Sequence, residues 1–205
     1  MKSADVPVAG LVLAAGAGRR MGTPKALVRD PAGVPWVVRA SRVLADGGCT
    51  PVVVVIGAAA DQVRAELTSE PVEVVEATDW SEGMGASLRA GLTALRDLPA
   101  AAVGDGEVVG VVVVPVDLPG LTAAAVRRVA DGAGARVLAR ATYHGVPGHP
   151  VVIGRAHWDG VIASARGDEG ARGYLRAHDV VAVECADLGD GADVDTVDDL
   201  PPGHG

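Results

Sequence analysis

A glycine-rich segment near the start of the chain carries residue types that are suited to binding phosphate. It spans residues 16–25, with the sequence GAGRRMGTPK, and it follows the apolar run Val8–Leu13. Glycine lets backbone N–H groups approach a bound group closely, and successive N–H groups form a concavity that binds anions. Arg19, Arg20 and Lys25 add positive charge to a chain whose formal net charge is −8. The segment therefore predicts a polyphosphate site after a buried strand.

Two other interpretations of this segment compete with a polyphosphate site. A simple tight turn is one, but the Arg-Arg and Pro-Lys pairs argue against it. The spacing of Gly16, Gly18 and Gly22 also fits a loose dinucleotide motif, which would make the chain a nicotinamide dehydrogenase. That fold expects an acidic residue at the end of the second strand. The second expected strand, Val52–Ile56, is followed by Gly-Ala-Ala-Ala, which disfavours a dehydrogenase.

A carboxylate follows the longest apolar run of the chain, residues 108–116, which we expect to form the central strand. Asp117 would then lie at the carboxyl end of a parallel strand, where such sheets bind ligands. It could equally cap the helix that we expect to begin near Thr122. The phosphate loop favours a metal role, because Mg²⁺ prefers one or two carboxylates together with substrate phosphates and water.

Alternating strands and helices predict a three-layer α/β/α fold with a doubly wound, mostly parallel, Rossmann-like sheet. Strands are expected at 8–13, 52–56, 72–75, 108–116, 136–141 and 180–184, and helices at 34–44, 61–67, 86–95, 122–130, 155–164 and 171–177. Residues 143–150 are expected to form a turn-rich loop that leads into a short strand. We expect an Ala/Gly-rich linker at 98–106 and a disordered tail after Leu200.

Composition limits the classes of protein to which the chain can belong. At 205 residues, 49% hydrophobic and without Phe, it is expected to form one domain, 1–205, with a Val-, Leu- and Ala-rich core from about 8 to 200. The acidic balance argues against nucleic-acid and membrane binding. Cys49 and Cys185 provide no disulfide framework. No secretory or membrane-spanning pattern is evident, so a cytoplasmic location is expected.

Several motifs together resemble the nucleotidyltransferases of the MobA-like class, and most closely its molybdenum cofactor cytidylyltransferase branch. The resemblance covers about residues 8–200. It is carried by Leu13-Ala14-Ala15-Gly16-x-Gly18-x-Arg20-Met21-Gly22-x-Pro24-Lys25, Gly83-Met84-Gly85-x-Ser87-Leu88, Asp117-x-Pro119, Gly148-His149-Pro150, Gly167-Asp168-x-Gly170-x-Arg172 and Asp193-x-Asp195-Thr196. One departure is Val197, where relatives often have Pro.

The resemblance implies a fold of the nucleotide-diphospho-sugar transferase type and an enzyme that moves CMP from CTP to a phosphorylated pterin, the molybdenum cofactor. The implied metal is Mg²⁺ or Mn²⁺, held by Asp117 and Asp195, and a molybdenum hydroxylase is a possible partner. The nucleotide-binding residues would be Leu13, Ala14, Ala15, Gly16, Gly18, Arg19, Lys25, Gly83 and Ser87. Lys25, Arg20 and Asp117 would be catalytic, and His149 and Arg172 would face the acceptor.

Some alternatives remain open within this resemblance. The chain could transfer GMP or UMP to another phosphorylated acceptor, or it could be a non-catalytic carrier of the cofactor. We favour CTP because guanylyltransferase relatives tend to have glycine where this chain has Ala15, whose Cβ would crowd a purine. We favour catalysis because a carrier needs no metal pair.

Overall fold

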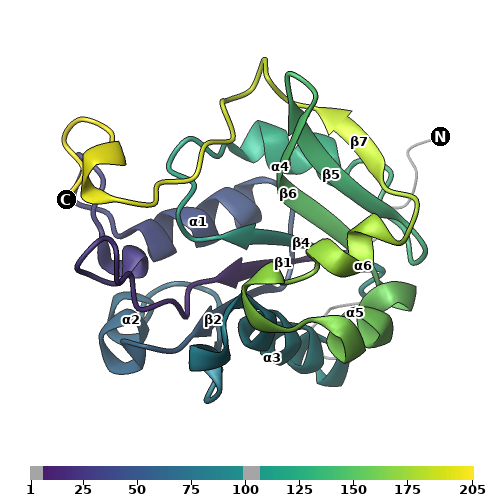
Figure 1. Cartoon of the computed structure of the whole chain (residues 1–205), viewed down its shortest axis with the longest axis horizontal. Helices are drawn as coiled ribbons and strands as arrows, with labels where there is room; N and C mark the ends of the chain where they lie inside the picture. Colours follow the sequence, from purple (N-terminus) through teal and green to yellow (C-terminus); the bar gives the residue numbers. More distant parts are fainter. Residues whose placement is uncertain (1–6, 99–106) are drawn as a thin grey trace.

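The computed structural model describes residues 7–98 and 107–205, which form one seven-stranded sheet covered by helices on both faces (Figure 1). The strand order is β3-β2-β1-β4-β6-β5-β7. The strands are β1 (Val8–Leu13), β2 (Val52–Ile56), β3 (Glu73–Glu76), β4 (Gly110–Pro115), β5 (Leu138–Tyr143), β6 (Val146–Gly154) and β7 (Val181–Glu184). Among the described strands only β6 runs antiparallel to its neighbours, so the predicted mostly parallel sheet is confirmed.

The helices divide into two layers, one on each face of the sheet. They are α1 (Trp36–Asp46), α2 (Ala60–Glu66), α3 (Met84–Asp97), α4 (Ala123–Ala130), α5 (Trp158–Ser164) and α6 (Arg172–Arg176). Buried side chains of α1, α2 and α4 share one apolar cluster with the sheet, and those of α3, α5 and α6 share the other. The three-layer arrangement expected from the alternation of apolar segments is therefore confirmed.

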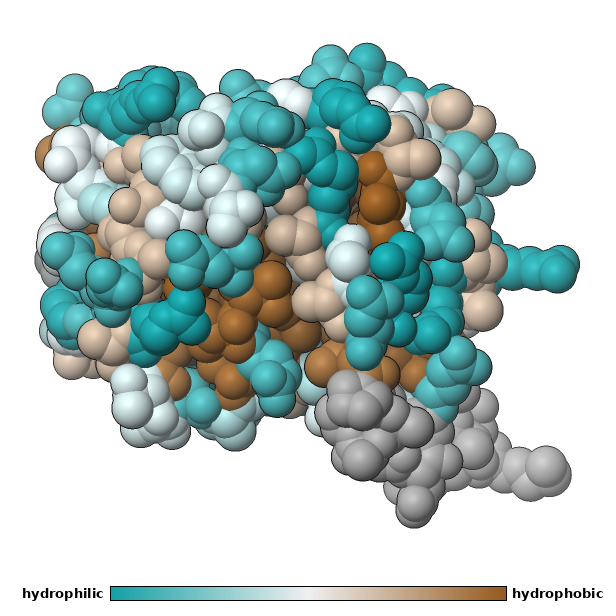
Figure 2. Space-filling view, turned by 90° about the horizontal axis from the view of Figure 1, so that it is seen from below, coloured by the Kyte–Doolittle hydropathy of each residue, from teal (hydrophilic) through white to brown (hydrophobic). Residues whose placement is uncertain are grey.

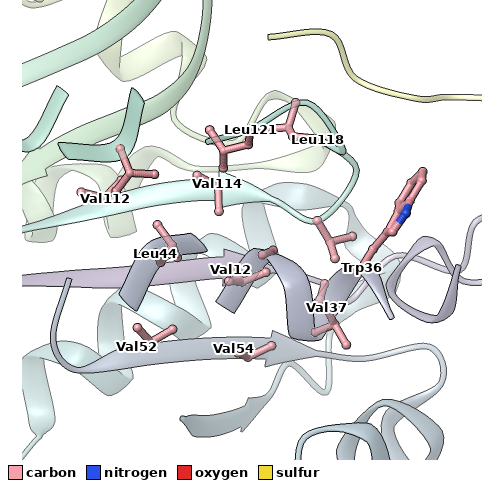
Figure 3. Close-up of a cluster of buried hydrophobic side chains, with 14 of the residues drawn as sticks. Val12, Trp36, Val37, Leu44, Val52, Val54, Val112, Val114, Leu118 and Leu121 are labelled. Carbon is pink, nitrogen blue, oxygen red and sulfur yellow. The ribbon is translucent and has the colours of Figure 1, made fainter. Parts of the chain in front are cut away.

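The centre of the sheet is buried on both faces and consists largely of valine. Every residue of β1, β2 and β4 is buried, as expected for parallel strands that lie between two helical layers. Figure 3 shows α1 laying Val37 and Leu44 toward the strand residues Val12 and Val54. Because branched, rigid side chains fill this core, the ends of the central strands have little freedom to shift.

The strand order creates a crevice at the carboxyl ends of β1 and β4. Leu13 ends β1 directly opposite Pro115, which ends β4. β2, the next strand in the chain, lies on one side of β1, and β4 lies on its other side. The direction in which strands are added to the sheet therefore reverses between β1 and β4. In open α/β sheets ligands bind in such a crevice. The loops after β1 and β4 are thus placed side by side.

The structure corrects the prediction for residues 143–150. These residues do not form a loop before a short strand, because β5 and β6 form a hairpin whose turn is His144-Gly145. Both turn residues have positive φ, 52° and 79°. Glu184 on β7 accepts hydrogen bonds from their two backbone N–H groups. The Gly-Pro-rich sequence becomes part of a strand because Val146 and Pro147 pair with β5, and the same strand continues beside β4 from Val151 onward.

The structure also corrects the predicted disorder after Leu200. The indole Nε1 of Trp36 donates to Nδ1 of His204 at 2.9 Å, and Arg29 and Gly205 exchange two backbone hydrogen bonds. These bonds anchor the tail to the start of α1, which composition alone does not indicate. Most of the linker expected at 98–106 lies outside the described residues.

Seen from below, the molecule has hydrophilic residues at its outermost positions and apolar residues in the recesses between them (Figure 2). Within the two described ranges, no helix combines the length and the apolar character needed to cross a membrane.

Candidate active site

The loop after β1 has the backbone geometry of an anion-binding segment. In the described part of the chain, the N–H groups of residues 15–20 donate to no carbonyl or side chain. Gly18 has a positive φ of 60°, and a Cβ at this position would collide with the carbonyl of Thr23. Only glycine fits there, because the positive φ and the close backbone approach both exclude a side chain. The loop therefore presents free N–H donors, as the sequence predicted.

Lys25 joins the two carboxylates that the sequence singled out from distant parts of the chain. Its Nζ donates to Oδ2 of Asp117 at 2.7 Å and to Oδ1 of Asp195 at 2.9 Å. The side chains of Lys25 and Asp117 are each only 17% exposed. The guanidinium of Arg20 donates to the other oxygen of Asp195 at 2.9 Å. Two cations and two carboxylates thus meet at the carboxyl ends of β1 and β4.

Local contacts place Asp195 at this junction. The backbone N–H of Val194 donates to the carbonyl of Asp117 at 3.0 Å, and the Val194 side chain is buried. After Asp195, Thr196 and Asp199 form a capping box at a short 3₁₀ turn, Val197–Asp199. Val197, the departure from the family pattern, disturbs none of these bonds. The closing segment is therefore held against the loop after β4.

Charge pairing shifts the protonation of the junction residues. Burial acts to lower the pKa of Lys25, but hydrogen bonds and charge attraction from Asp117 and Asp195 outweigh it, so the pKa is raised. The hydrogen bond from Lys25 is the main cause that lowers the pKa of Asp195. Lys25 is therefore protonated and Asp195 ionised at neutral pH.

The junction fits a divalent cation. Oδ1 of Asp117 is buried and has no hydrogen-bond partner among the described residues, although buried carboxylate oxygens normally have one. In the same residues no cluster of three or more His, Cys, Asp or Glu side chains forms a complete metal site. Mg²⁺ and Mn²⁺ bind through one or two carboxylates when phosphates and water complete the coordination. Asp117 and Asp195 are the residues that would hold such an ion.

The N-terminus of α3 faces the same region. Within the described residues no side chain caps this helix. The N–H of Ala86 donates to the carbonyl of Gly83 at 3.1 Å, which leaves the N–H groups of Met84 and Gly85 available. Ser87, in the first turn, is buried. Gly83 and Gly85 also have a packing role, because a Cβ on either would collide with residues 166–168 of the neighbouring segment. The sequence singled out Gly83 and Ser87 for binding but did not predict this contact.

Two hollows meet at the Lys25 junction. The smaller, about 400 Å³, is lined by the loop after β1, Trp80 and the start of α3. The larger, about 600 Å³, extends over β4 and β6 toward α6. Both hollows are lined by Leu13, Arg20, Lys25, Met84, Pro115, Asp117, Asp168 and Asp195. A reacting pair of ligands, one in each hollow, would meet beside Lys25.

The structure brings most of the predicted site residues together, in two groups. The smaller hollow is lined by Leu13, Ala15, Gly16, Gly18, Arg19, Arg20, Lys25, Gly83, Ser87, Asp117 and Asp195. Ala14 does not line it; this residue is buried and its N–H donates to Val55. His149 and Arg172 line only the larger hollow.

One charged residue of the larger hollow was missed by the sequence analysis. Arg140 lies on β5, directly opposite Val151 of β6, and lines this hollow beside His149 and Arg172. Burial, followed by the charge of Arg140, lowers the pKa of His149 to about 4, so its ring is neutral at pH 7. The sequence did hold a signal for this residue: Arg140 is charged, yet it falls two positions after Leu138 in the predicted strand 136–141, on the same face.

Comparisons with known proteins agree with this geometry. Residues 10–182 match the family model of the MobA-like NTP transferase domain. The chain is 37% identical over 211 residues to nicotine blue oxidoreductase of Paenarthrobacter nicotinovorans, covering 98% of each protein.

Solved structures show the same relationship. The homologue of Mycobacterium tuberculosis Rv0371c from Mycobacterium sp. strain JC1 superposes with a TM-score of 0.77 at 31% identity, covering 94% of this chain and 92% of that one. A manganese complex of Rv0371c from M. tuberculosis H37Rv gives a TM-score of 0.73 at 28% identity, covering 95% and 96%. The chain belongs to the MobA-like NTP transferase family and is a nucleotidyltransferase of that kind.

Proposed function

We propose that the chain transfers CMP from CTP to a phosphorylated acceptor, a molybdopterin-type pterin, and releases pyrophosphate. The observation that carries the proposal is the junction of the two hollows, where Lys25 bridges Asp117 and Asp195. The smaller hollow, with its free loop N–H groups, suits a nucleoside triphosphate. The larger hollow is left for the acceptor.

The proposed reaction is an in-line displacement at phosphorus. An oxygen of the acceptor phosphate forms a bond to the α-phosphorus, and the bond between the α-phosphorus and the bridging oxygen to the β-phosphate breaks. The electron pair leaves with pyrophosphate. A phosphate oxyanion is already a nucleophile at neutral pH, so no general base is required. Catalysis then depends on positioning and on neutralising charge.

The residues have distinct roles in this proposal. The N–H groups of the loop 15–20, with Arg19 and Arg20, hold the triphosphate. Lys25 stabilises negative charge that develops around the α-phosphate. A divalent ion held by Asp117 and Asp195 would supply further neutralisation of phosphate charge. His149 and Arg172 lie in the wall of the acceptor hollow.

The choice of CTP rests on Ala15. Its side chain is buried at 3% exposure in the wall of the smaller hollow. A Cβ added to Gly57 would come within 2.8 Å of the Ala15 Cβ, so the backbone of Gly57 packs closely against this methyl group. We infer that this methyl group restricts the space for a purine base.

Nucleotide binding and turnover test the proposal separately. Thermal unfolding is followed with CTP, GTP, UTP and ATP, each with and without Mg²⁺. A ligand at 100 times its dissociation constant stabilises the folded state by about 2.7 kcal/mol. We expect the largest shift with CTP and Mg²⁺, and pyrophosphate release only when the phosphorylated pterin is added. Stabilisation by GTP alone would contradict the choice of base. Binding without pyrophosphate release would favour a carrier.

A second candidate activity follows from one relative. The 37% identical protein from P. nicotinovorans is named an oxidoreductase that acts on nicotine blue. A reductase would use a nicotinamide dinucleotide, yet β2 is followed by Gly57 and alanines rather than by the acid that binds the ribose. Oxidation of NADH or NADPH by this chain in the presence of nicotine blue would support reduction. If the protein transfers the nucleotide but oxidises neither NADH nor NADPH, this alternative is excluded.

A further inference from the structure

We infer that Arg140 and Arg172 form an anion subsite in the larger hollow, so that the acceptor carries an anionic group bound by these two arginines. This inference extends the proposed function. It depends on that proposal in one respect, the assignment of the larger hollow to the acceptor. Neither arginine lines the smaller hollow. An anion bound to them would therefore belong to the acceptor and not to the triphosphate.

Arg140 is a charged residue on an otherwise apolar face of the sheet. It follows Leu138 by two positions on β5, and it lies opposite Val151 of β6. Leu138 and Val151 belong to the buried cluster beneath the sheet. Alternation along the strand thus directs the guanidinium of Arg140 to the side that α3, α5 and α6 cover.

The guanidinium of Arg140 lacks the partners that a buried charge needs. Its Nε is buried and has no hydrogen-bond partner among the described residues. Its one hydrogen bond, from Nη2 to the carbonyl of Gly148, is long at 3.5 Å. Burial and the positive charge of Arg172 lower the pKa of Arg140. Arg140 is only partly buried, but buried polar atoms normally have a hydrogen-bond partner, so the unsatisfied Nε leaves this guanidinium able to bind an anion.

The carboxylates of the hollow do not supply that anion. Asp117 and Asp195 are paired with Lys25, and Glu169 lies 3.8 Å from Arg176. Asp168 and Asp193 also line the hollow. Within residues 7–98 and 107–205, no carboxylate forms an ion pair with Arg140 or Arg172. Arg39, Arg127 and Arg166 form no such pair either, but they donate to backbone carbonyls at 3.1, 2.7 and 2.7 Å, closer than the one bond of Arg140.

The remaining wall of the hollow defines the rest of the ligand. Leu88, Val113, Val151 and Leu175 give this hollow an apolar surface. The neutral ring of His149 adds a hydrogen-bonding group that does not compete with the arginines for the anion. The acceptor class that fits is a molecule with an anionic group that guanidinium can bind and an uncharged part that packs against this apolar stretch.

Inorganic phosphate is the probe for this subsite. It is titrated by calorimetry into the full-length protein, both free and with CTP and Mg²⁺, at constant ionic strength. The variants are Arg140→Gln, Arg140→Lys and the control Arg136→Gln, which removes an exposed arginine just before the same strand. Loss of a charged hydrogen-bond donor should weaken phosphate binding roughly tenfold or more in Arg140→Gln. Arg140→Lys should retain part of the affinity, and Arg136→Gln should match the wild type.

Thermal unfolding without phosphate provides the second readout. Arg140→Gln should be at least as stable as the wild type, because the variant removes a partly buried charge that has no ion-pair partner. A lower melting temperature would show that Arg140 stabilises the fold and would overturn the inference. Unchanged phosphate affinity in Arg140→Gln, or an equal loss in Arg136→Gln, would also overturn it. CTP binding is measured separately in each variant, so failure of the nucleotide proposal remains distinguishable.

Discussion

Replacing Lys25 with methionine tests the central feature of the site. The variant removes the ammonium group that donates to Asp117 at 2.7 Å and to Asp195 at 2.9 Å, while it keeps an unbranched chain of similar length. The ammonium group is largely shielded from solvent, since the side chain is 17% exposed. We therefore expect its charge to act strongly on a neighbouring phosphate.

The expected loss can be bounded from two directions. A unit charge about 4 Å from another is worth about 4 kcal/mol at an effective dielectric constant of about 20. Removal of one donor that stabilises transition-state charge typically costs about 2.7–4 kcal/mol. Lys25→Met should therefore lower kcat by about 10²–10³-fold. The assay is pyrophosphate release at saturating CTP, Mg²⁺ and phosphorylated pterin, confirmed in a single turnover.

A second measurement separates loss of charge from loss of structure. Without Lys25, Asp117 and Asp195 have no shared cation, so Mn²⁺ should bind the nucleotide-free variant more tightly than the wild type. The pKa of Asp195 should also rise, because Lys25 is the main cause of its lowered value. Arg64→Met, which breaks an exposed ion pair with Glu76, is the control and should change neither quantity. A kcat within about threefold of the wild type would refute the assignment of Lys25.

Three further predictions concern the base, the core and the hairpin. Ala15→Gly should raise the GTP-to-CTP ratio of kcat/KM, and an unchanged ratio would argue against our interpretation of the base pocket. Gly91→Ala should lower the free energy of unfolding in urea by about 1–3 kcal/mol, because the added Cβ would lie 2.5 Å from Cδ1 of the buried Leu11. Gly173→Ala should not, because its Cβ would meet only Oε2 of Glu169 at an ordinary contact distance of 3.7 Å. Hydrogen bonds from the His144 turn lower the pKa of Glu184 from 4.5 to about 2. The stability advantage of the wild type over Glu184→Gln should thus be full above pH 4.5 and disappear toward pH 2; a pH-independent difference would contradict this.

Local sequence was sufficient to locate most of the regular elements. Val52–Ile56 and Val8–Leu13 are strands within their predicted bounds, because short valine-rich runs between turns have few alternatives. Thr122 caps α4 as a helix-start signal predicts. The hairpin at residues 143–150 was missed, because the pairing of Val146 and Pro147 with β5 depends on a tight turn at His144-Gly145 whose positive φ values the sequence did not signal.

The sequence by itself determined the residue types of the site. A glycine-rich cationic loop and the two carboxylates Asp117 and Asp195 can be recognised without coordinates, because their motifs are local. The tertiary structure alone decided that Lys25 bridges these carboxylates across 92 and 170 residues of chain. It also decided that the side chain of Arg140 lines the larger hollow without an ion-pair partner among the described residues. Both facts depend on strand order and register, which bring together residues that no short motif connects.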